Sequence, residues 1–246
     1  MSDRAHLTLR LEGPLQSWGS ESQFNRRQTN PLPTKSALLG MCCAAMRLGK
    51  GSPEEKAKLP ALAKLGCLVI ALNRPDSQYP TRRLEDYHTV QHTRTADGKT
   101  KETHLTRRDY LTDARFAAIL SGDAALLKEI AAALADPQWG IWLGRKACIP
   151  SAPVLAGIRA DEDVSLALRK TEAEALALVL DGEPLTAFTR QREVATFAEG
   201  NDTLRDQPLS FVTPRDFSPR RVKLWRAGEP EKSHDSKLPD DAAKTE

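Results

Sequence analysis

The first 36 residues combine an aromatic ring, permissive glycines and several cations, which together suit the binding of an extended polyanion. Trp18 and Gly19 lie in a polar loop, Arg26 and Arg27 follow, and Lys35 stands where a helix begins. A base can stack on an indole ring, glycine lets the backbone approach a phosphate, and cations near a helix N-terminus attract it. Two simpler interpretations stay open: Trp18 closes the end of a sheet, and each cation is a solvated surface residue.

Three of the five histidines, His88, His92 and His104, lie close together in the polar stretch 74–106. They could ligate zinc, but no cysteine is near to complete a closed site. A histidine with Tyr87 or a neighbouring lysine could instead act as general acid and base in a metal-independent ribonuclease. In the third interpretation, this stretch is a protrusion whose polar side chains contact nucleic acid.

Two further pairs of cations stand beside strand-like stretches. Arg107 and Arg108 stand at the start of one, where Arg108 could instead simply pair with Asp109 or Asp113. Arg145 and Lys146 follow Gly144, a glycine-cation order typical of a phosphate-binding loop. The motifs G-x-x-x-x-G-K-[ST], G-x-G-x-x-G, G-x-S-x-G and H-E-x-x-H are all absent from the sequence. The chain therefore lacks the signatures of P-loop and dinucleotide-binding enzymes, α/β-hydrolases and zinc proteases.

The composition is that of an ordinary globular protein. Of the 246 residues, 40% are hydrophobic and 28% are charged, enough for one large core or for one medium and one small core. No run of about 18 apolar residues occurs and the N-terminus lacks an apolar signal segment, so we expect a cytoplasmic protein without membrane contact. The cysteines at 42, 43, 67 and 148 form no C-x-x-C pair, which predicts buried thiols and no metal site.

Charge is distributed unevenly along the chain. The net charge is only +3, but residues 227–246 carry six acidic residues against three lysines, which leaves about +6 on residues 1–226. This acidic tail has no hydrophobic periodicity and is predicted to be disordered. A basic body is compatible with a nucleic-acid ligand, although many ordinary enzymes have the same balance.

Local patterns predict an α+β fold. In chain order we expect a strand at 6–11 and a helix with Thr34 as N-cap, Lys35 and Ser36 in its first turn and apolar residues to 48. A helix at 53–65, a strand at 66–73 and a hairpin within 74–106 that turns at 96–99 follow. Then come a strand at 107–120, a helix at 123–135 and a strand and loop at 139–146. With one extra helix and an inserted hairpin, this order is the ferredoxin-like β-α-β-β-α-β unit. A first domain of residues 1–150 would precede a small β-rich C-terminal domain of residues 151–226. That domain would contain a short acidic helix at 161–174 and strand-like pieces near 176–180, 192–197 and 220–225.

Five stretches match a known family in order. They are 9–19 (LRLEGPLQSWG), 33–40 (PTKSALLG), 86–90 (DYHTV), 108–114 (RDYLTDA) and 142–150 (WLGRKACIP). In these stretches the chain resembles the CasD family, a type I-E CRISPR Cascade subunit of the RAMP superfamily. The resemblance spans residues 5–155 and is loose beyond them.

The resemblance implies an RRM-like palm with an inserted β-hairpin thumb at 84–105 and a small C-terminal domain. It implies a non-catalytic subunit that grips the 5′ handle of the CRISPR RNA and caps the backbone filament, without a cofactor. The implied partners are the Cascade subunits CasC and CasA, the other Cascade subunits and, indirectly, target DNA. In type I-E systems a separate subunit, CasE, cleaves the transcript, whereas the corresponding type I-C protein cleaves RNA itself. A metal-independent endoribonuclease acting on repeat RNA therefore stays the alternative.

By position, the resemblance implies RNA contacts from the palm, the thumb and two flanking stretches. The palm contacts are Gln16, Ser17, Trp18, Gly19, Arg26, Arg27, Lys35 and Ser36. The thumb contributes Tyr87, His88 and His92, and the remaining cations of the cradle are Arg107, Arg108, Arg145 and Lys146. No catalytic residue and no metal ligand is implied.

Overall fold

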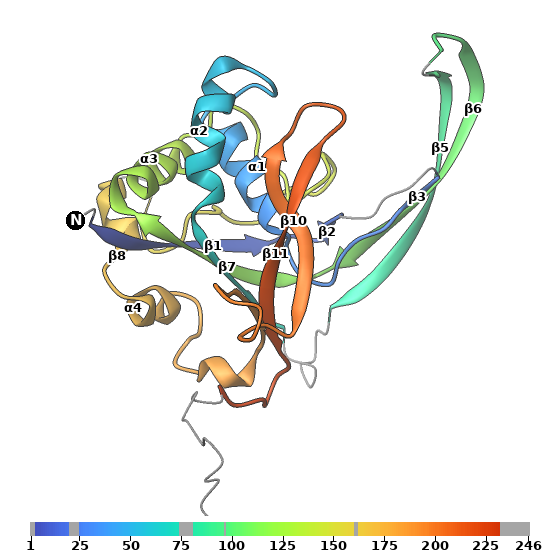
Figure 1. Ribbon diagram of the computed structural model, residues 1–246. Helices are drawn as coiled ribbons and strands as arrows, with labels where there is room; N and C mark the ends of the chain where they lie inside the picture. Colours follow the sequence, from blue (N-terminus) through green and yellow to red (C-terminus); the bar gives the residue numbers. More distant parts are fainter. Residues whose placement is uncertain (1–2, 20–24, 74–80, 96, 160–161, 232–246) are drawn as a thin grey trace, which may run out of the picture.

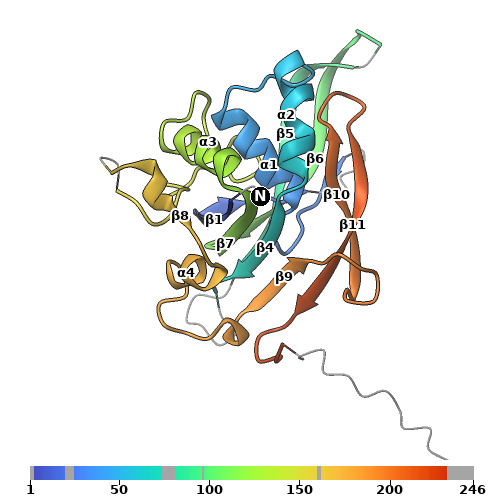
Figure 2. The same ribbon diagram turned by 60° about the vertical axis from the view of Figure 1, so that its left-hand side comes forward.

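The computed structural model of the protein describes residues 3–19, 25–73, 81–95, 97–159 and 162–231. Its largest element is an antiparallel sheet of seven strands. The elements are β1 (Arg4–Glu12), β2 (Leu15–Gln16), β3 (Arg26–Arg27), α1 (Lys35–Ala45), α2 (Pro53–Ala63), β4 (Gly66–Ala71), β5 (Arg82–Arg94), β6 (Thr100–Thr112), β7 (Arg115–Asp123), α3 (Ala124–Ala135), η1 (Val164–Ala167), β8 (Leu168–Arg169), α4 (Glu172–Ala177), η2 (Leu185–Ala187), β9 (Thr189–Glu193), β10 (Asp202–Ser210) and β11 (Asp216–Trp225). The sheet has the strand order β10-β11-β9-β4-β7-β1-β8, and β2, β3, β5 and β6 form a second sheet. Helices α1, α2 and α3 lie on one side of the large sheet and α4 on the other (Figures 1 and 2).

The central strands are apolar on both faces because both faces of the sheet are covered. In β4, Cys67 and Val69 belong to the core under α1, α2 and α3. The alternate residues Leu68 and Ile70 pack in a second cluster that includes Ala175 of α4. This covering explains why residues 66–73 read as a continuous apolar run, as a strand buried on both faces does.

The three covering helices begin at residues that sequence rules favour. The side chains of Thr34, Ser52 and Asp123 each accept a hydrogen bond from an amide in the first turn of α1, α2 and α3. Such an acceptor satisfies one of the amides that a helix N-terminus leaves unpaired. The prediction of Thr34 as an N-cap is therefore confirmed.

The β5–β6 hairpin extends away from the large sheet as a long arm, called the thumb below (Figure 1). It is longer than predicted, because β6 continues to Thr112 and β7 begins only at Arg115. Arg107 and Arg108 therefore lie within the thumb and not at the start of a sheet strand. At its base, β2 and β3 pair with β6, which brings the N-terminal loop against the thumb.

The C-terminal strands continue the large sheet and form no sheet of their own. β9 pairs with β4, β11 with β9 and β10 with β11, so the boundary expected near residue 150 does not separate two sheets. Residues 139–146, expected as a strand followed by a loop, contain no strand, and β8 takes the place beside β1. The helix expected at 161–174 is replaced by η1 and α4, and residues 178–180 form a turn.

The first residues of the predicted tail have defined contacts. The buried guanidinium of Arg190 donates to the carbonyl of Glu229 at 3.2 Å and pairs with the carboxylate of Glu231 at 3.4 Å. The prediction of disorder is therefore wrong for residues 227–231, and residues 232–246 lie outside the described residues. In the described part of the chain, no helix is long and apolar enough to cross a membrane.

Candidate nucleic-acid interface

A groove with a volume of about 720 Å³ lies between α1, the loop at 139–146 and the β10–β11 hairpin, and is called the basic groove below. Its polar and charged lining residues are Ser17, Arg27, Ser36, Lys50, Glu55, Arg145, Arg205, Asp206 and Arg215. The larger apolar side chains in the lining are Met41, Leu48, Trp139, Ile141, Trp142, Phe211 and Phe217. Cations outnumber acids among these residues, and both acids are buried, so the accessible charge of the groove is positive.

The cations reach the groove from separate parts of the chain. Arg27 comes from β3, Arg145 from the loop at 139–146, and Arg205 and Arg215 from β10 and the turn that follows it. Several guanidinium groups around one groove can contact successive phosphates of a strand, because each presents its donors in a planar fork. This arrangement fits a polyanion that runs through the groove.

Arg145 is fixed by backbone contacts to two segments. Its guanidinium donates to the carbonyl of Asp109 (Nη1, 2.8 Å) and to that of Arg27 (Nη2, 2.6 Å). At the preceding Gly144 φ is 101°, and a Cβ there would lie 1.8 Å from the carbonyl oxygen of Ser17, so only glycine permits this approach. The predicted glycine-cation loop and the N-terminal loop therefore meet at one site.

Two tryptophans present their rings at the groove. Trp139 is 42% exposed, and Trp142 is partly exposed with the ammonium of Lys146 5.7 Å from its ring centroid. Phe217 also lines the groove and packs edge-on against Phe211, with 6.4 Å between the ring centroids. Unpaired bases can stack on such rings whatever their sequence.

Trp18, the expected stacking platform, is completely buried. Its backbone amide donates to Thr29 Oγ1 at 2.8 Å and its carbonyl accepts from the amide of Asn30 at 2.8 Å, which closes the N-terminal loop around it. The ring belongs to the core under the helices and offers no face to a base. The alternative interpretation, in which Trp18 closes the end of the sheet, is the one that the structure supports.

Lys35 is also fully buried and is not available to a ligand. Its Nζ donates to the carboxylate of Glu193 at 2.7 Å and to the carbonyl of Ala63 at 2.8 Å. Its backbone amide donates to Asp206 at 2.8 Å, and Asp206 also accepts two hydrogen bonds from Arg220, at 2.6 and 2.9 Å. Lys35, Glu193, Asp206 and Arg220 form the buried charge cluster, which joins α1 to β9, β10 and β11.

The other expected palm residues divide between structure and groove. Gln16 is buried, and its amide donates to two backbone carbonyls at 3.0 and 2.6 Å, so it fixes the end of β1 and does not face a ligand. Gly19 and Ser36 line the groove, and Ser17 lines it with only 4% of its surface exposed. Arg27 is the one expected palm cation, among the described residues, that lines the groove.

Arg26 lies at a different site from its neighbour Arg27. Its guanidinium is 3.5 Å from the carboxylate of Glu85, which also accepts from Arg107 at 3.1 Å. Arg26 and Arg107 line a cleft of about 340 Å³ at the base of the thumb, together with Asn25, Tyr87, Leu105 and Thr106. The adjacent arginines therefore serve two separate surfaces.

Tyr87 and His88 point to opposite faces of the thumb, because successive side chains of a strand alternate. Tyr87 is 62% exposed and lies in the thumb cleft, with the Arg107 guanidinium 5.9 Å from its ring centroid. His88, on the other face, has Nδ1 3.4 Å from the carboxylate of Asp86. Tyr87 and His88 therefore cannot both reach the same phosphate, as general acid and general base catalysis by this pair would require.

The remaining thumb residues have separate surroundings. His92 has a φ of 53° within β5, and His104 Nε2 lies 2.9 Å from the side-chain oxygen of Asn25. Arg108 donates to Thr106 Oγ1 at 3.1 Å. Within the ranges that the structure describes, no three histidine, cysteine or acidic side chains gather as metal ligands.

All four cysteines are buried and unpaired, as the sequence predicted. Burial raises the pKa of Cys42 and of Cys43 to about 12 and that of Cys67 to about 11. These thiols are therefore protonated at neutral pH and are not nucleophiles. Cys43 contributes a neutral surface to the basic groove.

The side of the groove that β10 and β11 form was not predicted from the sequence. Arg205 and Arg215 lie there, but β10 was not predicted because its pairing with β11 shifts register between Leu204 and Gln207 and again after Pro208. These irregularities interrupt the alternation by which a strand is recognised. The alternation of arginines and phenylalanines in residues 205–217 was the sequence signal that could have indicated this part of the groove.

The chain is similar to CRISPR-associated proteins in family, sequence and structure. Residues 6–223 match the model of the family described as CRISPR-associated protein (Cas_Cas5). Over 230 residues the chain is 29% identical to the Escherichia coli (strain K12) protein named CRISPR system Cascade subunit CasD, covering 92% of this chain and 97% of that one. The resemblance to CasD is thereby confirmed.

Two solved structures share the fold over most of the chain. A chain of a CRISPR RNA-guided surveillance complex is 29% identical with a TM-score of 0.69, and 90% of each chain is covered. A crystal structure of a Cas protein is 28% identical with a TM-score of 0.61, covering 90% of this chain and 94% of that one. Because the family model spans most of its residues, this chain belongs to the CRISPR-associated Cas5 family.

Proposed function

We propose that the chain is the RNA-binding subunit of a type I-E Cascade complex and that it grips the 5′ handle of the CRISPR RNA in the basic groove. The observation that carries this proposal is that cations from β3, the loop at 139–146 and the β10–β11 hairpin line one groove with Trp139, which is exposed, and Trp142, which is partly exposed. Membership of the Cas5 family, and the names of the relatives, support it.

In this proposal the groove holds a single strand whose bases are splayed apart. Arg27, Arg145, Arg205 and Arg215 contact phosphates and set the register of the strand. Unpaired bases stack near Trp142, where each stacked base contributes roughly 1–3 kcal/mol. Single-stranded RNA is commonly recognised in this way, through splayed bases and backbone contacts.

The proposal extends to the fold and the partners. Strands in the order β8-β1-β7-β4, with α1 and α3 on one face, are the arrangement of a ferredoxin-like palm, from which the thumb protrudes (Figure 1). We place the chain in the cytoplasm at the end of the backbone filament, in contact with CasC and CasA. Target DNA is then recognised by pairing with the guide and not by this subunit.

We infer that the subunit retains RNA without cleaving it. A general acid and a general base must both reach the reacting phosphate, within hydrogen-bond distance. The separation of Tyr87 and His88 onto opposite faces of the thumb supports retention over cleavage.

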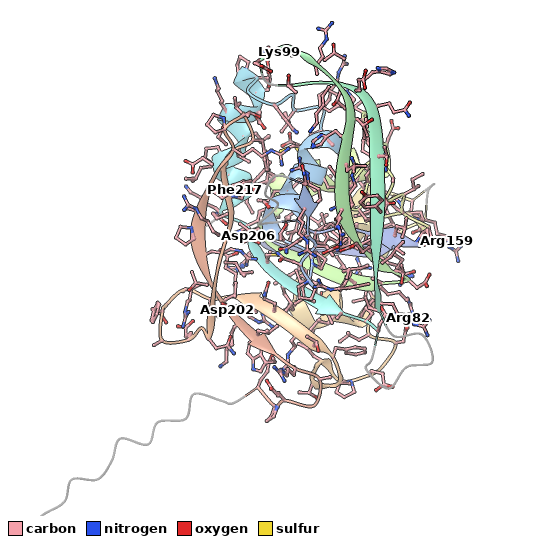
Figure 3. The ribbon with its side chains drawn as sticks, turned by 90° about the vertical axis from the view of Figure 1, so that its right-hand side faces the viewer. Arg82, Lys99, Arg159, Asp202, Asp206 and Phe217 are labelled. Carbon is pink, nitrogen blue, oxygen red and sulfur yellow. The ribbon has the colours of Figure 1, made fainter. Side chains whose placement is uncertain are left out.

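The proposal is tested with purified protein, labelled repeat RNA and EDTA, reading binding and cleavage on one gel. We expect a shifted band of intact RNA. Arg215→Ala should weaken binding and reduce the slope of log affinity against log salt by about 0.7, the contribution of one phosphate contact to a single strand. The matched control is Arg159→Ala, an exposed arginine on the other side of the molecule from Phe217 (Figure 3), which should leave both quantities unchanged.

Two results would overturn the proposal. If Arg159→Ala and Arg215→Ala weaken binding equally, the basic groove is not the RNA site. If the repeat RNA is cut at one position in EDTA, the chain is a metal-independent endoribonuclease, and His88→Ala should then abolish the cut.

A further inference from the structure

The loop at 194–201, between β9 and β10, holds an aromatic ring in solvent. Phe197 is 78% exposed, the largest exposed fraction among the large hydrophobic side chains of the described residues. One face of its ring is covered by the guanidinium of Arg221, whose Cζ lies 4.0 Å from the ring centroid. The rest of the ring is open to solvent.

Arg221 fixes this loop as well as the ring. Its Nε donates to the carbonyl of Phe197 at 3.0 Å, Nη1 to Thr203 Oγ1 at 3.0 Å and Nη2 to the carbonyl of Gly200 at 2.5 Å. A Cβ at Gly200 would lie 2.6 Å from Arg221 Cγ, so glycine allows the loop to lie against this side chain. The amide of Val194 donates to the carbonyl of Arg221 at 3.0 Å and anchors the start of the loop.

Single exposed apolar side chains are common on protein surfaces. Phe197 differs from them because Arg221 holds both its ring and the backbone of its loop in place. A side chain that is free in solution loses rotamer entropy when a partner binds it, and this loss weakens the binding. Here the backbone and one face of the ring are already held. A rigid exposed aromatic ring is the usual form of an anchor residue in a protein interface.

The charges around the ring favour a protein over a nucleic acid. The cation at the ring is Arg221, and its guanidinium already donates to two backbone carbonyls of the loop and to Thr203 Oγ1. Residues 194–203 themselves contain two acidic residues, Glu199 and Asp202, and no basic residue, and both acids are exposed. They would repel a phosphate backbone. Asp202 also lies at the end of the β10–β11 hairpin away from Phe217 and the basic groove (Figure 3).

We propose that Phe197 inserts into an apolar pocket, rimmed by lysine or arginine, on a neighbouring protein subunit of the complex. The identity of the partner as a Cascade subunit rests on the proposed function, whereas the surface itself does not. Arg221 is then a positioning residue that presents the ring, and Glu199 and Asp202 pair with the basic rim.

The proposal is tested in the assembled complex. A tagged full-length chain is co-expressed with the other subunits and CRISPR RNA, and the co-purifying subunits are quantified by native mass spectrometry after dilution. Phe197→Ser should reduce retention of one neighbouring subunit at least tenfold, and Glu199→Lys with Asp202→Lys should reduce retention of the same subunit. The control Leu209→Ser removes another exposed apolar side chain, from β10, and should leave the composition unchanged.

The affinity of the isolated chain for repeat RNA is measured with the same variants, and Phe197→Ser should leave it unchanged. If the Phe197→Ser complex retains every subunit as well as the wild-type complex does, the proposal is wrong. A loss of RNA affinity in the isolated chain would also overturn it, because the ring would then contact nucleic acid. Failure of the proposed function is a separate result, in which the wild-type chain itself does not bind RNA.

Discussion

At the scale of single residues, neighbours in space decide what a side chain does. Trp18 and Trp142 both stand near glycines and polar residues in loops, yet Trp18 is completely buried and Trp142 lines the basic groove. Trp18 stabilises the fold because its apolar surface is removed from water. The second is available to a ligand.

The two tryptophans should therefore respond differently to substitution. Trp18→Ala leaves a cavity in the core and should lower the free energy of unfolding by about 3–5 kcal/mol. Trp142 is partly exposed, so Trp142→Ala should lower it by less, but it should weaken binding of repeat RNA about tenfold, from the loss of stacking. Urea unfolding and a gel-shift titration measure the two effects. Loss of RNA affinity in a folded Trp18→Ala protein, with Trp142→Ala unaffected, would contradict the assignment.

A second residue-scale prediction concerns pH. Burial lowers the pKa of His6, in β1, below its ordinary value of 6.5; Glu172 partly opposes this shift, and Arg4 and Arg192 add to it. The unfolded chain then takes up the proton first as pH falls, so the neutral histidine contributes stability above pH 6.5 that is lost below it.

The free energy of unfolding should therefore decrease between pH 7.5 and 5.5, by at most about 1.4 kcal/mol per pH unit from this group. His6→Gln should make the decrease smaller, and His92→Gln in the thumb controls for the loss of an imidazole. Equal pH dependence in wild type and His6→Gln, by urea unfolding at each pH, would show that His6 does not carry the effect.

At the scale of elements, the buried charge cluster ties the first helix to strands from the other end of the chain. Lys35 lies at the start of α1, whereas Glu193, Asp206 and Arg220 lie in β9, β10 and β11. Because α1 and β10 both line the basic groove, the cluster sets the relative position of two of its sides. A buried ion pair of this kind fixes geometry more than it adds stability.

Removing one partner should be more damaging than removing both. Lys35→Met leaves Glu193 without its ammonium, and we expect a loss of about 3 kcal/mol, at the low end for a buried pair because Glu193 is partly exposed. Adding Glu193→Leu should recover part of this loss. A double-mutant cycle by urea unfolding measures the coupling, and additive effects would show that the two groups do not interact.

At the scale of the whole molecule, the groove depends on both halves of the chain. Arg27 and Arg145 come from the first 150 residues, and Arg205 and Arg215 from the last third. The sheet joins the halves directly, because β9 pairs with β4. The groove is therefore built from residues of both halves of the chain.

The elements that sequence predicted best are those whose signals are local. The alternation of β1, the apolar run of β4 and the N-cap at Thr34 each depend on adjacent residues. The burial of Lys35 could not be predicted in the same way, because its partner Glu193 is 158 residues away in the sequence. The polar neighbours of Trp18 likewise gave no sign of the helices that cover it. Long-range packing decided these positions.

The continuity of the large sheet has a consequence for how a ligand enters. Two sides of the groove, α1 and the β10–β11 hairpin, are joined by the buried charge cluster, and the hairpin continues the large sheet through β9. If the basic groove holds RNA as proposed, the protein offers a site that is already formed, and most of the conformational freedom lost on binding is that of the RNA. A handle whose free form already resembles its bound shape should bind more tightly than a disordered strand of equal length and charge.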